Sequence, residues 1–265
     1  MDILKKSLAP VTEKTWEELH TQANRILKSR LTARKFVDVD GPKGWDYGAL
    51  PLGRLDIPDG ADKGDVRYGI NTVQPLVETR VPFILNIWEL DNITRGAQDA
   101  DLGPMEDAAR NIAGFEEQAV YYGFENGGIT GLKEATGYKK VSCPKKAEEV
   151  LRCVPQGISE FKEASIDGPY LLVVNPTDWR EITSYIKGYP LKRQVEQNLE
   201  AEIVFCPNID NMFLVTNRGG DYQLTLGADL SIGYERHDSE NVHLYFTESF
   251  TFRVLEPNAV FVFEE

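Results

Sequence analysis

The residues that could carry out catalysis are few and lie far apart in the sequence. Its histidines are His20, His237 and His243. None belongs to an HExxH motif, and the sequence contains no phosphate loop, no GxGxxG and no GxSxG nucleophile elbow. Nucleophilic catalysis needs a base beside the nucleophile, and no such unit can be recognised. We therefore assign no catalytic residue and expect the protein not to be an enzyme.

Two groups of acidic residues are of a type that binds metal ions. Glu116 and Glu117 fall within a helical pattern, and Glu89 and Asp91 follow Trp88. A carboxylate-bridged di-iron centre needs a Glu-x-x-His motif on each of two helices, and we do not find that pair of motifs. We therefore expect these carboxylates to lie on solvated helix faces, and we predict no metal site.

The cysteines and the apolar segments limit where the protein works. Cys143, Cys153 and Cys206 are far apart and include no CxxC pair, which predicts reduced thiols. No segment approaches the roughly 20 apolar residues of a membrane helix. The N-terminal MDILKKSLAP is not followed by the apolar stretch of a signal peptide. We expect a cytoplasmic protein with no membrane partner.

The charge of the chain argues against a nucleic-acid partner. The formal net charge is −13, and an acidic surface repels phosphate groups unless a local basic patch is present. The densest basic cluster, at 139–146, is short and is followed at once by two glutamates. We therefore expect no nucleic acid to bind.

Two helices stand out among the elements that must position any functional group. Thr12 is a suitable N-cap, and apolar residues then recur at helical spacing as far as Leu27. The longest helical pattern lies between Pro104 and Asn126 and stops at two glycines. The second helix is long enough to serve as the spine of a mixed domain.

The rest of the chain predicts extended and mixed structure. Residues 41–65 are rich in Gly, Pro and Asp, which indicates a projecting loop or hairpin that a neighbouring subunit would have to stabilise. Helical and strand patterns alternate over 132–225, which predicts a compact α/β subdomain. A Gly-Gly-Asp turn at 219–221 interrupts its last strand segment. Apolar residues at every second position of 242–254 predict a long antiparallel pair.

Six segments of this sequence together resemble type 1 encapsulins. They follow one another in the family's order, span nearly the whole chain, and include the specific string RGGDYQLTLGADLSIGYE. The segments are LAPVTEKTWEEL at 8–19, RKFVDVDGPKGWDYGA at 34–49, WELDNITRG at 88–96, IDGPY at 166–170, RGGDYQLTLGADLSIGYE at 218–235 and TESFTFRVLEP at 247–257.

The resemblance implies an α+β chain with the Hong Kong 97-type phage capsid fold, built from a peripheral domain, an axial domain and an extended loop. It also implies a homo-oligomer of about 60 copies, the number that icosahedral symmetry requires with one chain per asymmetric unit. The implied parts are the N-terminal helix and first part of the peripheral domain at 1–45, the extended loop at 46–75, the peripheral domain with its spine helix at 76–131, the axial domain at 132–225, and the C-terminal strands of the peripheral domain at 226–265.

The resemblance further implies that the shell encloses cargo enzymes, which dock on its inner wall through a C-terminal targeting peptide. The usual cargo classes are ferritin-like iron-storage or iron-oxidising proteins and dye-decolourising peroxidases. Apolar residues would receive peptide side chains, and Arg34 and Asp38 would be charged anchors. Read without the family, the same residues would be core and capping residues. The positions that match the family's groove are Ile26, Leu27, Leu31, Arg34, Asp38, Leu230, Ile232 and Tyr234.

The family's five-fold pore is implied at the loop that contains the string YIKGY. Lys187 would form a basic ring around an opening for small molecules and ions, and Gly188 stands where the family often has histidine. The positions that match the pore lining are Tyr185, Ile186, Lys187, Gly188 and Tyr189.

Some family members also bind a flavin beside a tryptophan that follows an arginine by eight residues. Arg80 and Trp88 keep this spacing. An indole can stack on the flavin of FMN, and a guanidinium can bind its phosphate. The alternative is that Trp88 is an interface residue, and no cofactor is expected to be required.

Two other functions stay open on the sequence alone. A phage or prophage major capsid protein would have the same fold, although RKFVDVD together with DLSIGY favours the encapsulin. A flavin-binding redox protein would use Arg80 and Trp88, but it would also need a catalytic unit that the sequence does not offer.

Overall fold

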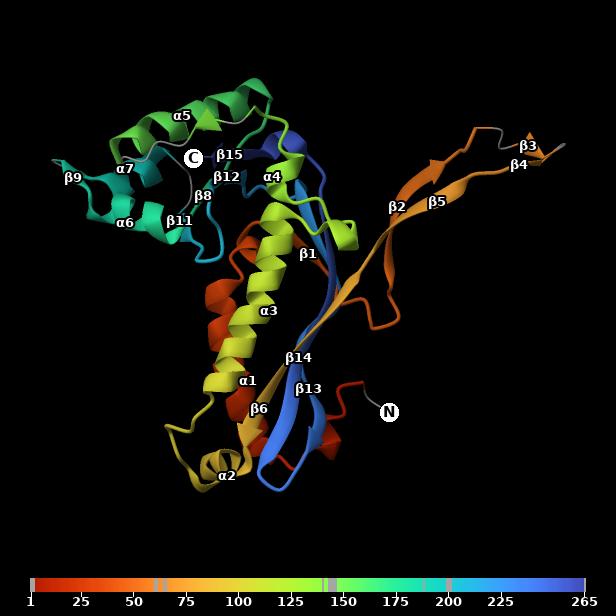
Figure 1. The fold of residues 1–265 in the computed structure, drawn as a ribbon. Coiled ribbons are helices and arrows are strands. Elements are labelled where there is room, and N and C mark those ends of the chain that lie inside the picture. The colour runs from red at the N-terminus through yellow and green to blue at the C-terminus, as the bar shows by residue number, and fades with distance from the viewer. Residues whose placement is uncertain are drawn as a thin grey trace.

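The computed structural model describes residues 3–59, 62–63, 66–139, 141–142, 147–187, 189–198 and 202–264. Helix α3 (Gly103–Tyr122) runs along a long antiparallel sheet, a compact α/β part sits at one end of that helix, and a slender hairpin projects to one side (Figure 1). The α+β class predicted from the sequence is confirmed.

The long sheet has the strand order β1-β13-β14-β6. Strands β13 (Tyr222–His237) and β14 (Asn241–Val254) form an antiparallel pair, which confirms the prediction from alternating apolar residues. Strand β6 (Val77–Asn86) pairs antiparallel with β14, and the short β1 (Asp38–Asp40) pairs parallel with β13.

Helices α1 (Glu13–Arg30), α2 (Ile87–Arg95) and α3 form a core with this sheet (Figure 1). Helix α1 begins as predicted, because the hydroxyl of Thr12 accepts a hydrogen bond from the backbone N–H of Thr15. Helix α1 packs against α3, and α3 packs against β6 and β14. The buried side chains of this core include Leu19, Ala23, Met105, Ile112, Leu244 and Phe246.

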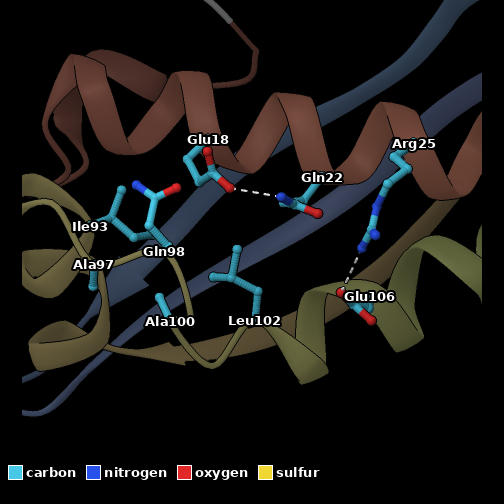
Figure 2. A pocket seen from close by; sticks show the side chains of 9 residues that line it. All are labelled: Glu18, Gln22, Arg25, Ile93, Ala97, Gln98, Ala100, Leu102 and Glu106. Carbon is cyan, nitrogen blue, oxygen red and sulfur yellow. Dashed lines mark hydrogen bonds and ion pairs between the residues drawn. The ribbon is translucent and has the colours of Figure 1, made fainter.

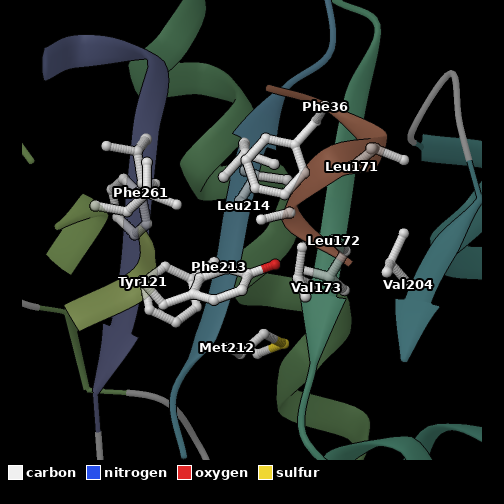
Figure 3. Packing of buried hydrophobic residues seen from close by; sticks show 14 of the residues in the cluster. Phe36, Tyr121, Leu171, Leu172, Val173, Val204, Met212, Phe213, Leu214 and Phe261 are labelled. Carbon is white, nitrogen blue, oxygen red and sulfur yellow. The ribbon is translucent and has the colours of Figure 1, made fainter. Parts of the chain in front are cut away.

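The compact part is built on a five-stranded sheet of order β11-β8-β12-β15-β7. Tyr121 of α3 and Phe36 reach into its core, where the ring centroids of Tyr121 and Phe213 are 4.9 Å apart (Figure 3). Helix α3 therefore joins the two cores. The strands are β7 (Val141–Ser142), β8 (Tyr170–Val174), β11 (Ile203–Phe205), β12 (Met212–Thr216) and β15 (Val260–Glu264), and the helices are α4 (Leu132–Ala135), α5 (Ala147–Glu163), α6 (Pro176–Ser184) and α7 (Leu191–Asn198).

The last strand joins the sheet of the compact part and not the long sheet. From the sequence, 226–265 are grouped as one set of C-terminal strands, and within that range β15 pairs with β12 and β7. Its first four residues are all buried, as in a strand with both faces covered. The turn at 219–221 likewise carries the chain from β12 in one sheet to β13 in the other. Gly219 and Gly220 have φ angles of +79° and +84°, which favour glycine.

The projecting hairpin predicted from the Gly- and Pro-rich stretch is present. Strand β2 (Ala49–Asp56) pairs antiparallel with β5 (Ile70–Pro75), and β3 (Asp62–Lys63) pairs with β4 (Val66–Arg67) near the tip (Figure 1). The remaining short elements are the hairpin of β9 (Ile186–Lys187) and β10 (Tyr189–Pro190), and the 3₁₀ helices η1 (Lys6–Leu8), η2 (Ala33–Lys35), η3 (Glu125–Gly127) and η4 (Pro257–Ala259).

Candidate functional site

A pocket opens beside the C-terminal half of α1, and we call it the α1 pocket. Its cavity volume is about 310 Å³. Leucine side chains from α1 and β13 supply an apolar wall, and lysine and asparagine side chains surround it. The lining residues are Asn24, Leu27, Lys28, Leu31, Arg34, Lys35, Asp229 and Leu230.

Two local features of the chain build this pocket. Asn24, Leu27 and Leu31 follow one another at spacings of three and four, so they lie on one face of α1 and its cap. On the opposite side, β13 bulges. Asp229 and Leu230 stand between two regular pairs with β14, and only Glu248 lies opposite them. The bulge directs these residues out of the regular ladder and toward the helix end.

The structure divides the eight residues predicted to bind the targeting peptide. Leu27, Leu31, Arg34 and Leu230 come together as lining of the α1 pocket. The other four lie elsewhere. The side chains of Ile26, Ile232 and Tyr234 belong to the core beneath α1 and do not line the pocket, whereas Leu27 and Leu31 belong to both. The carboxylate of Asp38 accepts a hydrogen bond from the backbone N–H of Gly220 at 2.6 Å.

Arg34 binds three carboxylates at once, and we call these four residues the Arg34 cluster. Its Nε donates to Glu116 Oε1 at 2.9 Å, and its Nη2 donates to Glu116 and Glu248 at 2.5 Å each. Its Nη1 donates to Asp229 Oδ1 at 2.9 Å. The side chains of Glu116 and Glu248 are fully buried, whereas Asp229 is 49% exposed. Arg34 thus connects a buried carboxyl pair to the wall of the pocket.

The charges in the Arg34 cluster are unequal in number, with one cation facing three carboxyl groups. Burial alone would lower the pKa of Arg34, but the hydrogen bond and charge of Glu116 outweigh burial and raise it, so the guanidinium stays charged. Burial, followed by the charge of Glu116 and a hydrogen bond with it, raises the pKa of Glu248 well above its usual range. Glu248 therefore holds a proton more firmly than an exposed glutamate does.

The expectation that Glu116 and Glu117 lie on a solvated helix face is wrong. Both side chains are fully buried, because this part of α3 is covered by η2 and the adjoining strands. Glu117 accepts hydrogen bonds from the backbone N–H of Ala33 at 2.9 Å, from the Thr32 hydroxyl and from Cys206 Sγ. Burial raises the pKa of Glu117 to about 7, although the bonds from Thr32 and Ala33 oppose the shift.

The second acidic group singled out from the sequence is Glu89 with Asp91, and the described residues contain no metal site there. Glu89 is half-buried and Asp91 is exposed, close to expectation. No cluster of three or more His, Cys, Asp or Glu side chains suited to a metal ion occurs among the described residues. Within the same residues, no helix has the length and apolarity needed to cross a bilayer.

A second pocket, of about 260 Å³, lies between α1 and the segment that joins α2 to α3 (Figure 2). Its polar side chains largely pair with one another. Gln22 donates to Glu18 at 2.8 Å, and Arg25 lies 3.5 Å from Glu106 (Figure 2). This pocket contains none of the residues predicted to bind the targeting peptide.

The predicted pore residues lie in the short hairpin of β9 and β10. Tyr185 caps α6 and is half-buried, and Ile186 is 70% exposed. Gly188 lies outside the described residues, and only the backbone of Lys187 and Tyr189 is described. The hairpin exposes an apolar side chain at the edge of the compact part, and its pore role stays a prediction.

The predicted flavin pair is not brought together within one chain. The guanidinium of Arg80 lies 4.2 Å from the ring centre of Tyr245 and pairs with Glu78 at 3.7 Å. Trp88 is 68% exposed at the start of α2, where Arg95 lies 6.0 Å from its ring centre. From Arg80 to the end of β6 the strand advances by about 20 Å. The two side chains have different partners, and the chain alone does not present them as one flavin site.

Several residues of the site could not be recognised from the sequence. Glu116, Glu248 and Asp229 gather around Arg34 from positions 82, 214 and 195 residues away. The only local signal is the spacing of polar residues along α1, which places Asn24 and Lys28 on the pocket face.

Comparison with known proteins identifies the family. The family of encapsulating proteins for peroxidase, Linocin_M18, matches residues 1–251. The type 1 encapsulin shell protein of Rhodospirillum rubrum is 40% identical over 266 residues, which cover 98% of this chain and 95% of that protein. The type 1 encapsulin shell protein of Rhodococcus erythropolis is 37% identical over 261 residues, which cover 98% of each.

Solved structures show the same architecture. A virus-like particle from Pyrococcus furiosus aligns with a TM-score of 0.66 at 21% identity, over 95% of this chain and 98% of that chain. The capsid of Myoviridae phage XM1 aligns with a TM-score of 0.55 at 11% identity, over 88% and 91%. These likenesses show the fold predicted from the sequence, that of Hong Kong 97-type phage capsids. Together with the near-full-length sequence matches, they show that the chain belongs to the type 1 encapsulin shell proteins, which are structural proteins and not enzymes.

Proposed function

We propose that about sixty copies of this chain form a closed icosahedral shell with one chain per asymmetric unit. The shell lies in the cytoplasm and encloses a cargo protein. The alignments to two type 1 encapsulin shell proteins cover 98% of this chain and nearly all of each relative, which supports assembly into a shell.

The projecting hairpin supports assembly. Leu55, Ile57 and Tyr68 are 58%, 70% and 43% exposed, and Ile70 and Val73 are also exposed. A soluble monomer rarely leaves so many large apolar side chains uncovered in one slender element. A neighbouring copy of the chain would bury them and stabilise a hairpin that has little core of its own.

We assign the parts of the shell as the resemblance implies, with one change. Residues 46–75 form the extended loop, and residues 132–225 form the axial domain. The change is that 260–264 join the axial domain, because β15 pairs with β12. The remaining residues form the peripheral domain. The loop at 185–189 would then line a pore at the five-fold axis.

We further propose that the targeting peptide of the cargo docks in the α1 pocket. The single observation that carries this is the joining of three leucines, Leu27, Leu31 and Leu230, with charged side chains at the edge of one cavity. Apolar peptide side chains would fill the leucine wall, and the edge would orient the backbone. The cargo would be a ferritin-like iron-storage or iron-oxidising protein, or a dye-decolourising peroxidase.

The docking proposal is tested by Leu230→Asp, because Leu230 is only half-buried and lines the pocket. The matched control is Leu255→Asp, which changes a leucine that is 48% exposed and does not line the pocket. Each variant is co-expressed with the protein that co-purifies with the wild-type shell, and cargo per particle is measured by mass spectrometry and electron microscopy. Leu230→Asp should give intact but empty shells, and Leu255→Asp should load normally. Unchanged loading of Leu230→Asp would reject the pocket.

A further inference from the structure

The Arg34 cluster joins the α1 pocket to a buried pair of carboxyl groups. Arg34 contacts Asp229 on the pocket side at 2.9 Å and Glu248 on the buried side at 2.5 Å. The side chain of Arg34 is 18% exposed, whereas Glu116 and Glu248 are fully enclosed. A ligand in the pocket would therefore cover the only members of the cluster that water reaches.

Glu116 and Glu248 could carry two negative charges, and Arg34 supplies only one positive charge. Two carboxylates on one guanidinium would leave an excess negative charge in a place that water does not reach. Glu248 Oε2 has no hydrogen-bond partner among the described residues, and a charged carboxylate oxygen left unpaired in such a place is especially costly. Glu116 and Glu248 both accept from Nη2 of Arg34 at 2.5 Å, so the two carboxyl groups lie side by side. The charge of Glu116 therefore favours a proton on Glu248.

We propose that docking in the α1 pocket is linked to one proton held by Glu248, and that the pocket binds an apolar peptide more tightly when this proton is present. The inference rests on the proposed docking function. Glu248 is a positioning residue here. It acts through Arg34 on Asp229 and does not line the pocket itself.

The groups that face the pair come from every element packed around it. Helix η2 contributes Arg34, β13 contributes Asp229, and α3 contributes Glu116. Strand β6 places Thr79, which does not ionise, opposite Glu248. The next acid on α3, Glu117, bonds instead to Thr32, Ala33 and Cys206. Arg34 is therefore the one cation among the described residues that pairs with Glu116 and Glu248.

The direction of the linkage follows from desolvation. With the proton present, the Arg34 cluster carries a net charge of −1, and without it the net charge is −2. An apolar peptide side chain against Leu230 removes water from Arg34 and Asp229, and this water screens the excess charge. Docking is then less favourable for the deprotonated form. By linkage, docking takes up a proton, and affinity falls as the pH rises through the titration of Glu248.

The proton itself can be observed without any ligand. Infrared difference spectra of assembled wild-type shells minus Glu248→Gln shells at pH 7 should show the C=O band of a protonated carboxylic acid. The band should be lost from the wild type at higher pH. Glu181→Gln, which changes an exposed acid on α6, is the control and should leave the band in place. Absence of the band from wild-type shells at pH 7 would overturn the inference.

The linkage is tested with a blocked, uncharged peptide of Leu, Ile, Gly and Ser that carries a fluorophore with no titration between pH 6 and pH 9. Its affinity for wild-type shells should fall by up to about tenfold per pH unit above the titration of Glu248, the limit for one linked proton. Glu248→Gln should remove this dependence. Calorimetry of the wild type in two buffers of different ionisation enthalpy should show proton uptake.

The outcomes separate the two proposals. Binding that is the same at every pH, or a pH profile that Glu248→Gln leaves unchanged, would overturn the proton linkage while leaving the pocket intact as a docking site. If the peptide binds at no pH, or binds Leu230→Asp as well as the wild type, the α1 pocket is not the docking site. In that case both the proposed docking function and the linkage fail.

Discussion

Replacing Arg34 by Met should destabilise the folded chain strongly, although Arg34 lies at the edge of a pocket. The substitution keeps an apolar stem but leaves Glu116 and Glu248 buried without their cation. Breaking a buried ion pair by removing one partner costs about 3–5 kcal/mol. For a chain of this size, about 1 kcal/mol shifts the Tm by about 2–4 °C. The Tm should therefore fall by about 6–20 °C.

The effect should depend on pH in a defined direction. Loss of Arg34 removes an attraction that lowers the pKa of Glu248, so the folded-state pKa rises further above the unfolded value of about 4.3. The folded variant then binds more protons than the unfolded chain, and its stability falls as the pH rises. The difference from wild type should be smaller at pH 5 than at pH 7.5.

The assay is thermal unfolding of assembled shells followed by tryptophan fluorescence at both pH values. The matched control is Lys35→Met, because Lys35 is the next residue, is exposed and has no ion pair among the described residues. Its change should stay within about 0.5 kcal/mol. An Arg34→Met shift no larger than that of the control, or a larger shift at pH 5 than at pH 7.5, would refute the reasoning.

Three further predictions follow from burial and exposure. Glu117→Gln should make the Tm depend less on pH between pH 5 and pH 7. Burial raises the pKa of Glu117 to about 7, so the wild type loses up to about 3 kcal/mol of stability as the pH rises through this range. An unchanged pH profile would contradict this. Ile57→Asp should leave the subunit folded by circular dichroism but prevent shell formation, since Ile57 is 70% exposed on the hairpin; normal shells by electron microscopy would count against the hairpin as an interface. Ile232→Asp should cost more than about 3 kcal/mol and give insoluble protein, because Ile232 is 2% exposed; a soluble variant with wild-type Tm would disagree.

The sequence predicts those elements of the fold that depend on local signals. Alternating apolar residues at 242–254 predict the β13–β14 pair, and Thr12 predicts the start of α1. Glycines and prolines predict the projecting hairpin. Each of these signals lies within the element that it specifies, so no knowledge of distant contacts is needed.

The parts that the sequence does not predict depend on distant contacts. From the sequence, Glu116 is predicted to be a surface acid, because its partner Arg34 is 82 residues away and the pairing has no local signal. The bulge at Asp229 and Leu230 has no local signature, yet it builds one wall of the α1 pocket. Strand β15 shares the apolar character of the neighbouring strands, and only tertiary pairing decides which sheet it joins.

The corrected positions also change how docking should be tested. From the sequence, Arg34 and Ile232 would be natural sites to disrupt the groove, but both stabilise the fold. A loss of loading in such variants could follow from loss of structure. Leu230 lines the pocket and is half-buried, so it separates docking from folding.

The mass of the assembled particle tests the central claim most directly. The purified chain should be measured by native mass spectrometry or mass photometry, with negative-stain microscopy of the same sample. Sixty chains of 29.9 kDa give closed, spherical particles of about 1.8 MDa. A sample that contains only particles of one to three chains would contradict the account.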